Sequence, residues 1–203
     1  MNTVTGNNIT AIDHRKRLLD GMSKCVAEQG YATTTIADIA STAHVSKRTF
    51  YEHFRSKQDC LLALYENATG AAMQRLKDVA IAESGKPDWL DQAVAAYFGY
   101  LAERPQQLRT LFVEVISLGM DGLKARRKVH QELARLLTCG ADAQSAELAR
   151  YTAAGVIGVL VEFVLCAIED NAIAELPSLA PQASRIIRNT LEAMDQPAGR
   201  LAA

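Results

Sequence analysis

Hydrophobic residues recur every three to four positions along nearly the whole chain, the spacing that one face of an amphipathic α-helix produces. The first run stops at Gly30, a residue that commonly follows the last turn of a helix. No segment alternates with period two for long enough to build a sheet. The pattern therefore predicts an all-α fold, with helices over about 12–29, 36–42, 47–54, 57–79, 88–101, 105–116, 123–137, 142–170 and 181–194.

Residues that favour helix starts stand at several of these boundaries. Thr35 and Asp38 have the spacing of a capping box, with Asp in place of the usual Glu. Ser46 can cap the helix that follows it, and the fixed backbone of Pro105 suits a first helical residue. These signals agree with the helices that the hydrophobic spacing predicts.

Glycine and proline predict the later breaks. Gly119 and Gly122 bracket an expected bend before the helix over 123–137. Pro177 and Pro181 are expected to precede the last helix, because proline is poorly tolerated in a helix interior.

Residues 35–54 form two short predicted helices joined by a tight turn, the layout of a helix-turn-helix. In that motif the N-terminal side chains of the second helix reach base edges in the major groove of DNA. Arg48 can make a bidentate contact to guanine, and the free N–H groups of the helix start suit a phosphate. The candidate DNA contacts are Thr35, Ser46, Lys47, Arg48, Thr49, Tyr51, His53 and Lys57.

The segment TIADIASTAHVSKRTFYEHFRSKQDCLLALYE resembles the DNA-binding signature of the TetR family of transcriptional regulators, and the likeness covers roughly residues 12–66. The resemblance implies a three-helix DNA-binding head, 1–57, and a larger helical body, 58–203, that binds a ligand and dimerises. It also implies a homodimeric repressor that a small molecule releases from a palindromic operator. It assigns DNA contacts, mostly to phosphate, to Thr35, Lys47, Arg48, Thr49, Tyr51, His53 and Lys57.

Two positions depart from the family pattern. His44 stands in the turn where the family usually has glycine, and we expect it to be a strained turn residue rather than a DNA contact. Arg48 stands where the family often has a small residue. An arginine there brings direct base reading into play, and the alternative is an exposed, solvated side chain.

Several side chains of the body are candidates for an effector cavity, although aromatic residues at helical spacing also fit an ordinary core. Glu162, inside an apolar helix, is expected either to bind the ligand or to pair across a dimer. We expect the dimer to form through the helices over 142–170 and 181–194, where Gly155 and Gly158 allow close approach. The candidate ligand-binding residues are Trp89, Tyr97, Tyr100, Phe112, Met120, His130, Glu162 and Phe163.

The charge balance limits how DNA can be bound. The chain has 203 residues and a formal net charge of −1, with 22 Lys and Arg against 23 Asp and Glu. This balance excludes a nonspecific polycation. Residues 1–60 hold 8 Lys and Arg against 6 Asp and Glu, so DNA affinity is expected to rest on a few placed contacts and on dimerisation.

The cysteines and the most apolar segment favour a cytoplasmic protein without a membrane partner. None of Cys25, Cys60, Cys139 and Cys166 is in a CxxC pair, which favours reduced thiols. Residues 151–168 are long enough to cross a membrane, but Glu162 near the middle argues against it. A thiol redox sensor, most plausibly through Cys139, is the alternative.

The usual signatures of catalysis are missing from the sequence. It has no GxxxxGK[ST], HExxH, GxSxG or Rossmann glycine pattern, and its histidines lack a metal-ligand spacing. We therefore expect no enzyme activity, metal or cofactor. The competing functions are a helical carrier or enzyme without DNA affinity, and a transcriptional activator or nucleoid-associated protein of the same fold.

Overall fold

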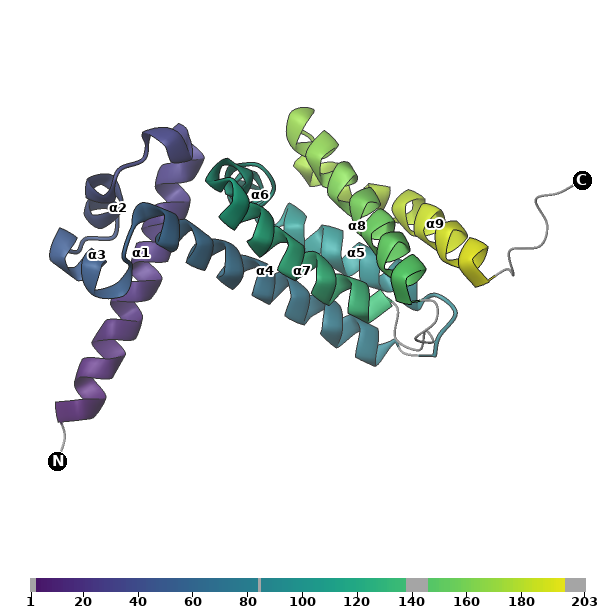
Figure 1. The fold of residues 1–203 in the computed structure, drawn as a ribbon, viewed down its shortest axis with the longest axis horizontal. Helices are drawn as coiled ribbons and strands as arrows, with labels where there is room; N and C mark the ends of the chain where they lie inside the picture. Colours follow the sequence, from purple (N-terminus) through teal and green to yellow (C-terminus); the bar gives the residue numbers. More distant parts are fainter. Residues whose placement is uncertain (1–2, 84, 138–145, 196–203) are drawn as a thin grey trace, which may run out of the picture. The chain divides into compact units, whose positions relative to one another are not determined.

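The computed structural model describes residues 3–83, 85–137 and 146–195, and the regular secondary structure in these ranges is helical (Figure 1). This confirms the all-α prediction. The helices are α1 (Thr3–Thr33), α2 (Ile36–Thr42), α3 (Lys47–His53), α4 (Lys57–Ala82), α5 (Trp89–Ala102), α6 (Pro105–Phe112), α7 (Met120–Leu137), α8 (Ala146–Glu169) and α9 (Leu176–Asp195), with 3₁₀ segments η1 (Glu114–Leu118) and η3 (Ile173–Glu175).

The chain forms two compact units, one of residues 1–70 and 106–125 and the other of 71–105 and 126–203. The first unit therefore contains more than the predicted head. It adds the first half of α4 and the segment from α6 to the start of α7. Among the helices of the described ranges, none has the length and apolar character needed to span a membrane.

An apolar cluster joins the first four helices in the first unit. Leu18 and Met22 of α1, Ile39 of α2, Phe50 of α3 and Leu61 of α4 are each 0 % exposed. Burying each of these side chains contributes about 1.5–3 kcal/mol relative to leaving it in water. Because every one of the four helices supplies a buried residue, α2 and α3 are fixed against α1 and α4.

The second unit packs α5, α8 and α9 together, and Figure 1 shows α8 and α9 side by side. Phe98 of α5 is fully buried and lies 6.1 Å from Phe163 of α8, measured between ring centroids. Arg188 of α9 forms an ion pair with Asp91 of α5, partly exposed at the edge of this interface. Apolar packing, with one ion pair at its edge, therefore joins these three helices.

The helix predicted over 105–116 ends earlier than expected. The α-helix stops at Phe112, and the tighter η1 follows and turns Val115 into the core. Gly119 has a φ of 62°, so the expected bend is there. Gly122 lies inside α7 rather than at the bend, and it packs so closely that a Cβ at this position would be 1.9 Å from the carbonyl oxygen of Val115.

The last helix begins at Leu176, five residues before the predicted start at 181. Pro177 and Pro181 both lie within the helix, so the prediction that they precede it is wrong. Pro177 is the second residue, where the N–H has no intrahelical partner in any sequence. Pro181 is the sixth residue, and its missing N–H leaves the Pro177 carbonyl without its intrahelical donor. The predicted helix start at 142, with Cys139 and Gly140 before it, falls outside the described residues.

The close approach at Gly122 predicts a large loss of stability for Gly122→Ala. The added methyl group meets backbone rather than a flexible side chain, so the free energy of unfolding should fall by about 1–3 kcal/mol. Urea unfolding followed by circular dichroism measures this. Gly70→Ala, in α4 with nothing within 4 Å of its Cβ, is the control and should stabilise the chain by up to about 1 kcal/mol. Equal changes in the free energy of unfolding for Gly122→Ala and Gly70→Ala would contradict the close approach at Gly122.

Candidate nucleic-acid interface

Two side-chain caps define the starts of α2 and α3. The Thr35 hydroxyl accepts a hydrogen bond from the Asp38 N–H at 3.2 Å, and the Asp38 carboxylate accepts from the Thr35 N–H at 2.9 Å. This is the predicted capping box, and the hydrogen bonds from Thr35 lower the pKa of the Asp38 carboxyl. Ser46 caps α3, its hydroxyl accepting from the Thr49 N–H at 3.0 Å. The boundaries of both helices are thus set by local sequence.

The turn between α2 and α3 closes as a Schellman motif around His44. The Val45 N–H donates to the Ala40 carbonyl at 2.9 Å, and the His44 N–H donates to the Ser41 carbonyl at 3.0 Å. His44 has a φ of 53°, in the left-handed region, which confirms it as a strained turn residue. Arg17 of α1 donates to the His44 carbonyl at 2.9 Å and so ties the turn to the first helix.

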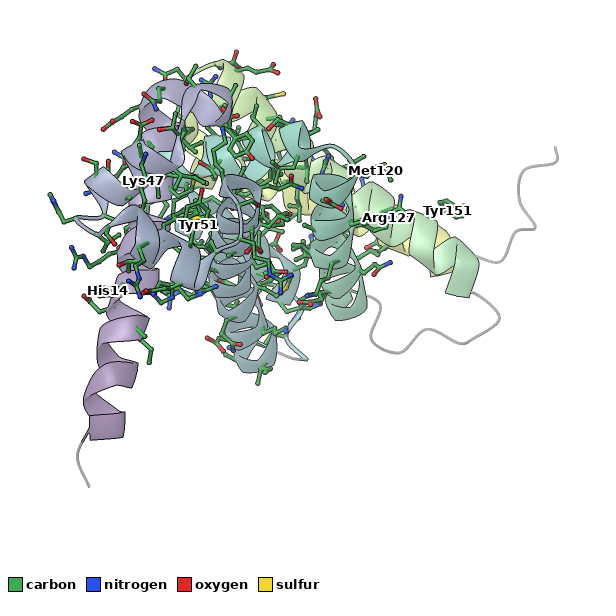
Figure 2. The ribbon with its side chains drawn as sticks, turned by 60° about the vertical axis from the view of Figure 1, so that its left-hand side comes forward. His14, Lys47, Tyr51, Met120, Arg127 and Tyr151 are labelled. Carbon is green, nitrogen blue, oxygen red and sulfur yellow. The ribbon has the colours of Figure 1, made fainter. Side chains whose placement is uncertain are left out.

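One side of α3 packs into the apolar cluster, and its other side faces solvent. Phe50 is fully buried and Phe54, which caps the helix, is 3 % exposed. Lys47 and Arg48 are exposed, and Tyr51 is 58 % exposed. Figure 2 labels Lys47 and Tyr51 on this short helix. Cationic and phenolic groups therefore share the solvent-facing side of the second helix of the motif.

Besides Thr35, three predicted DNA contacts at α3 make side-chain bonds within that helix and its cap. Arg48 pairs with Glu52 one turn along the helix, with 3.3 Å between Nε and Oε1, and its side chain is 90 % exposed. The hydroxyls of Ser46 and Thr49 lie 2.9 Å apart and bond to each other. Ser46 and Thr49 therefore shape the start of α3, while Arg48 remains at the surface where it can exchange its partner.

Lys57 differs from the other candidates, because its ammonium group points at protein backbone. Its Nζ lies 2.8 Å from the carbonyl oxygen of Tyr31 and 2.7 Å from that of Thr34. It also lies 4.2 Å from the centre of the Tyr31 ring. The prediction that Lys57 contacts phosphate stays a prediction, and this geometry bears on it below.

A basic cluster at α1 was missed from the sequence. The rings of His14 and His53 lie 6.4 Å apart, and the Arg15 guanidinium lies 5.4 Å from the centre of the Phe54 ring. Burial and, next, the nearby His14 lower the pKa of His53 below its usual 6.5. The run of basic residues 15–17 was the available signal, but the spacing did not show which side of α1 would face α3.

Comparison with known proteins agrees with this geometry. Residues 18–64, which hold α2, the turn and α3, match the model of bacterial regulatory proteins of the tetR family. Residues 18–64 are therefore a DNA-binding domain of the tetR family. Its structure also superposes on FadR from Bacillus subtilis in complex with stearoyl-CoA, with a TM-score of 0.73, 20 % identity, and 85 % of this chain and 96 % of that chain covered. A TetR-family regulator from Bordetella parapertussis has a TM-score of 0.61, 19 % identity, and coverage of 93 % and 98 %.

The curated relatives that match this chain are transcriptional regulators. The regulator YerO of Bacillus subtilis, itself uncharacterised, is 34 % identical over 88 residues, covering 42 % of this chain and 30 % of the relative. The fatty acid metabolism regulator of the same species is 24 % identical, covering 58 % and 59 %. The repressor NemR of Escherichia coli is 31 % identical, covering 45 % of each chain. The chain thus matches between about a third and three fifths of the length of these relatives.

The candidate ligand-binding residues of this chain lie in different surroundings. Met120 is 67 % exposed and Glu162 is exposed, whereas Trp89, Tyr97 and Phe112 are half-buried. Phe112 and Met120 belong to the first unit, and the other candidates belong to the second: Trp89, Tyr97, Tyr100, His130, Glu162 and Phe163. Their role as ligand contacts stays a prediction.

Two of the half-buried candidates in the second unit have distinctive electrostatics. Burial, with a smaller contribution from Arg126, lowers the pKa of His130 to about 4, so this imidazole is neutral at pH 7. The guanidinium of Arg104 lies over the Tyr100 ring, 3.9 Å from its centre. A neutral imidazole can donate or accept a hydrogen bond, which suits recognition of a polar ligand group.

The described residues offer little for metal or thiol chemistry. No group of three His, Cys, Asp or Glu side chains in these ranges could hold a metal ion. Cys25 and Cys60 are buried, and burial raises the pKa of the Cys60 thiol to about 12. Cys166 is exposed, while Cys139, the predicted sensor, lies outside the described residues.

The lowered pKa of His53 predicts DNA binding that strengthens as the pH falls. The fold disfavours the imidazolium form, so this histidine lowers folding stability as the pH falls below about 6.5, whereas a neighbouring phosphate favours the imidazolium. DNA binding should therefore take up a proton, and the Kd for a duplex should tighten by up to about tenfold per unit that DNA raises the pKa. Fluorescence anisotropy between pH 8 and pH 6 measures this.

His53→Gln is the matched variant, because it keeps a polar side chain that does not titrate. It should remove most of the pH dependence, while His44→Gln, in the exposed turn, should keep it. Identical pH profiles for the wild type and His53→Gln would show that His53 does not meet a phosphate.

Proposed function

We propose that the protein is a sequence-specific DNA-binding transcriptional repressor. The observation that carries this proposal is the exposed side of α3, where Lys47, Arg48 and Tyr51 stand on a helix that Phe50 fixes to the head. Thr35 and His53 flank this surface from α2 and from the end of α3. A DNA target would place the protein in the cytoplasm.

The working form is proposed to be a homodimer. Ala154, Gly155, Gly158, Glu162 and Cys166 follow one another at helical spacing along the exposed side of α8. A glycine in a helix interior costs about 0.5–1 kcal/mol relative to alanine, and no atom of the described residues lies within 4 Å of a Cβ built at either glycine. Close approach of a second copy gives both glycines a role.

In the proposed mechanism, the dimer holds two recognition helices about 34–36 Å apart, matching successive major grooves of a palindromic operator. A ligand that binds only the arrangement unable to reach both grooves shifts the population away from DNA. A coupling of about 1–3 kcal/mol would weaken DNA affinity about 5–150-fold. Because a neighbour of the same fold is a complex with stearoyl-CoA, a long-chain acyl-CoA is the first effector to test.

The second candidate is a thiol-responsive regulator of the same fold. The specific observation is the exposed Cys166, one turn from Glu162 on the proposed dimer surface. Replacing all four cysteines by serine tests this candidate, because a response to oxidant that survives the replacement excludes the thiol mechanism.

Arg48 is expected to read a base and Lys47 a phosphate. Arg48→Ala should lower discrimination at one base pair of each half-site by about 1–3 kcal/mol. Lys47→Ala should weaken binding to all duplexes similarly and reduce its salt dependence. Selection of bound duplexes from a random pool, followed by affinity measurements at several salt concentrations, checks both. If Arg48→Ala kept the wild-type site preference, Arg48 would not read a base.

A large side chain introduced on the surface where the second copy should approach tests the dimer. Gly158→Arg adds a long charged side chain on the exposed side of α8 without a clash inside the chain, so the fold should be kept. Analytical ultracentrifugation should show a monomer, with weaker binding to a two-half-site duplex. Gly70→Arg, at an exposed helical glycine of α4, is the control and should remain a dimer. A dimeric Gly158→Arg would place the interface elsewhere.

A further inference from the structure

The junction between α1 and α2 ends in carbonyl groups that the helices themselves do not satisfy. Gly30 has a φ of 78° and interrupts the helical backbone of α1. The last carbonyls of a helix lack intrahelical donors and carry the partial negative charge of the helix dipole. The hydroxyl of Thr34 donates to the Gly30 carbonyl at 2.7 Å, which satisfies only the first of them.

Lys57 satisfies the carbonyls that follow. Its ammonium lies 2.8 Å from the Tyr31 oxygen and 2.7 Å from the Thr34 oxygen, with the Ala32 oxygen at 3.4 Å. A lysine ammonium has three N–H donors, and these three carbonyls accept from them. The Tyr31 ring, with its centre 4.2 Å away, adds a cation–π contact. The group is thus surrounded by protein acceptors.

Tyr31 is held from its other side as well. Its N–H donates to the Glu114 carboxylate of η1 at 3.4 Å, and the Glu114 side chain is only 13 % exposed. Lys57 and Glu114 therefore bind the carbonyl side and the amide side of the same short junction. Thr35, which opens α2 through its capping box, follows this junction directly.

We propose that Lys57 is a positioning residue that fixes the α1–α2 junction to the start of α4, and that it does not bind a DNA phosphate. The proposal rests on the proposed DNA-binding function and deepens it, because it removes one residue from the DNA contacts and assigns it to the geometry of α2. The observation behind it is the set of three backbone carbonyls around one ammonium group.

The two roles differ in how DNA affinity depends on salt. A lysine that neutralises a phosphate releases a counterion, so its loss reduces the slope of log K against log salt by about 0.9. A lysine that only positions the junction leaves the slope unchanged. Its loss lowers stability, and it lowers affinity by the same factor at every salt concentration.

The experiment compares Lys57→Met with Lys47→Met, which remove the same charge from a half-buried and an exposed position. Lys57→Met should lower the Tm by about 3–12 °C and keep the wild-type salt slope. Lys47→Met should keep the Tm and lower the slope by about 0.9. A Lys57→Met protein with the wild-type Tm and a reduced slope would overturn the proposal.

A second measurement needs no variant and decides the question even if Lys57→Met does not fold. Wild-type protein is acetylated briefly with an N-hydroxysuccinimide ester, with and without a bound duplex, and each lysine is quantified by mass spectrometry. Lys57 should react slowly in both samples, whereas Lys47 should react fast alone and slowly on DNA. Fast acetylation of Lys57 in the free protein would overturn the proposal. If no duplex binds at all, the proposed function fails, while the reactivity of the free protein still tests the position of Lys57.

Discussion

The side of α3 that faces outward is decided by the burial of one aromatic residue. Phe50 is fully enclosed by α1, α2 and α4, and Phe54, one turn on, enters the same cluster. A helix of seven residues has only two turns, so anchoring this edge leaves little rotational freedom. Lys47, Arg48 and Tyr51 are exposed as a consequence. Any recognition of nucleic acid by this surface therefore depends on the packing of Phe50, a buried residue that does not itself contact nucleic acid.

The helix caps were predictable because each is a local interaction. Thr35 and Ser46 lie three residues from the groups they cap, so spacing alone identifies these caps. The first residue of α6, Pro105, was found for the same reason. The left-handed His44 was identified from the glycine that the family has in the turn. The family resemblance added the role of these helices, which the spacing could not supply.

Features that depend on distant parts of the chain were missed. Lys57 bonds residues about 25 positions away, and His14 meets His53 from another helix. The sequence predicts no partner within the chain for Lys57 or His14, because it does not show which carbonyls or rings of distant residues these side chains can reach. The 3₁₀ segment after Phe112 was also missed, because the apolar spacing continues through Val115 and Ile116 and does not distinguish a 3₁₀ turn from an α-helical one.

The ion pair between Arg48 and Glu52 has a consequence for the order of events on DNA. A guanine contact by Arg48 must replace a charge-assisted bond that the free protein already makes. The discrimination gained is therefore a difference between two bonds, and Glu52, once released, faces the phosphates with its negative charge. On a duplex without a guanine at this position, the bond to Glu52 is the more favourable one for Arg48. Under the proposed function, Arg48 is then expected to stay paired with Glu52 on noncognate DNA and to exchange partners only where a base accepts the stronger bond.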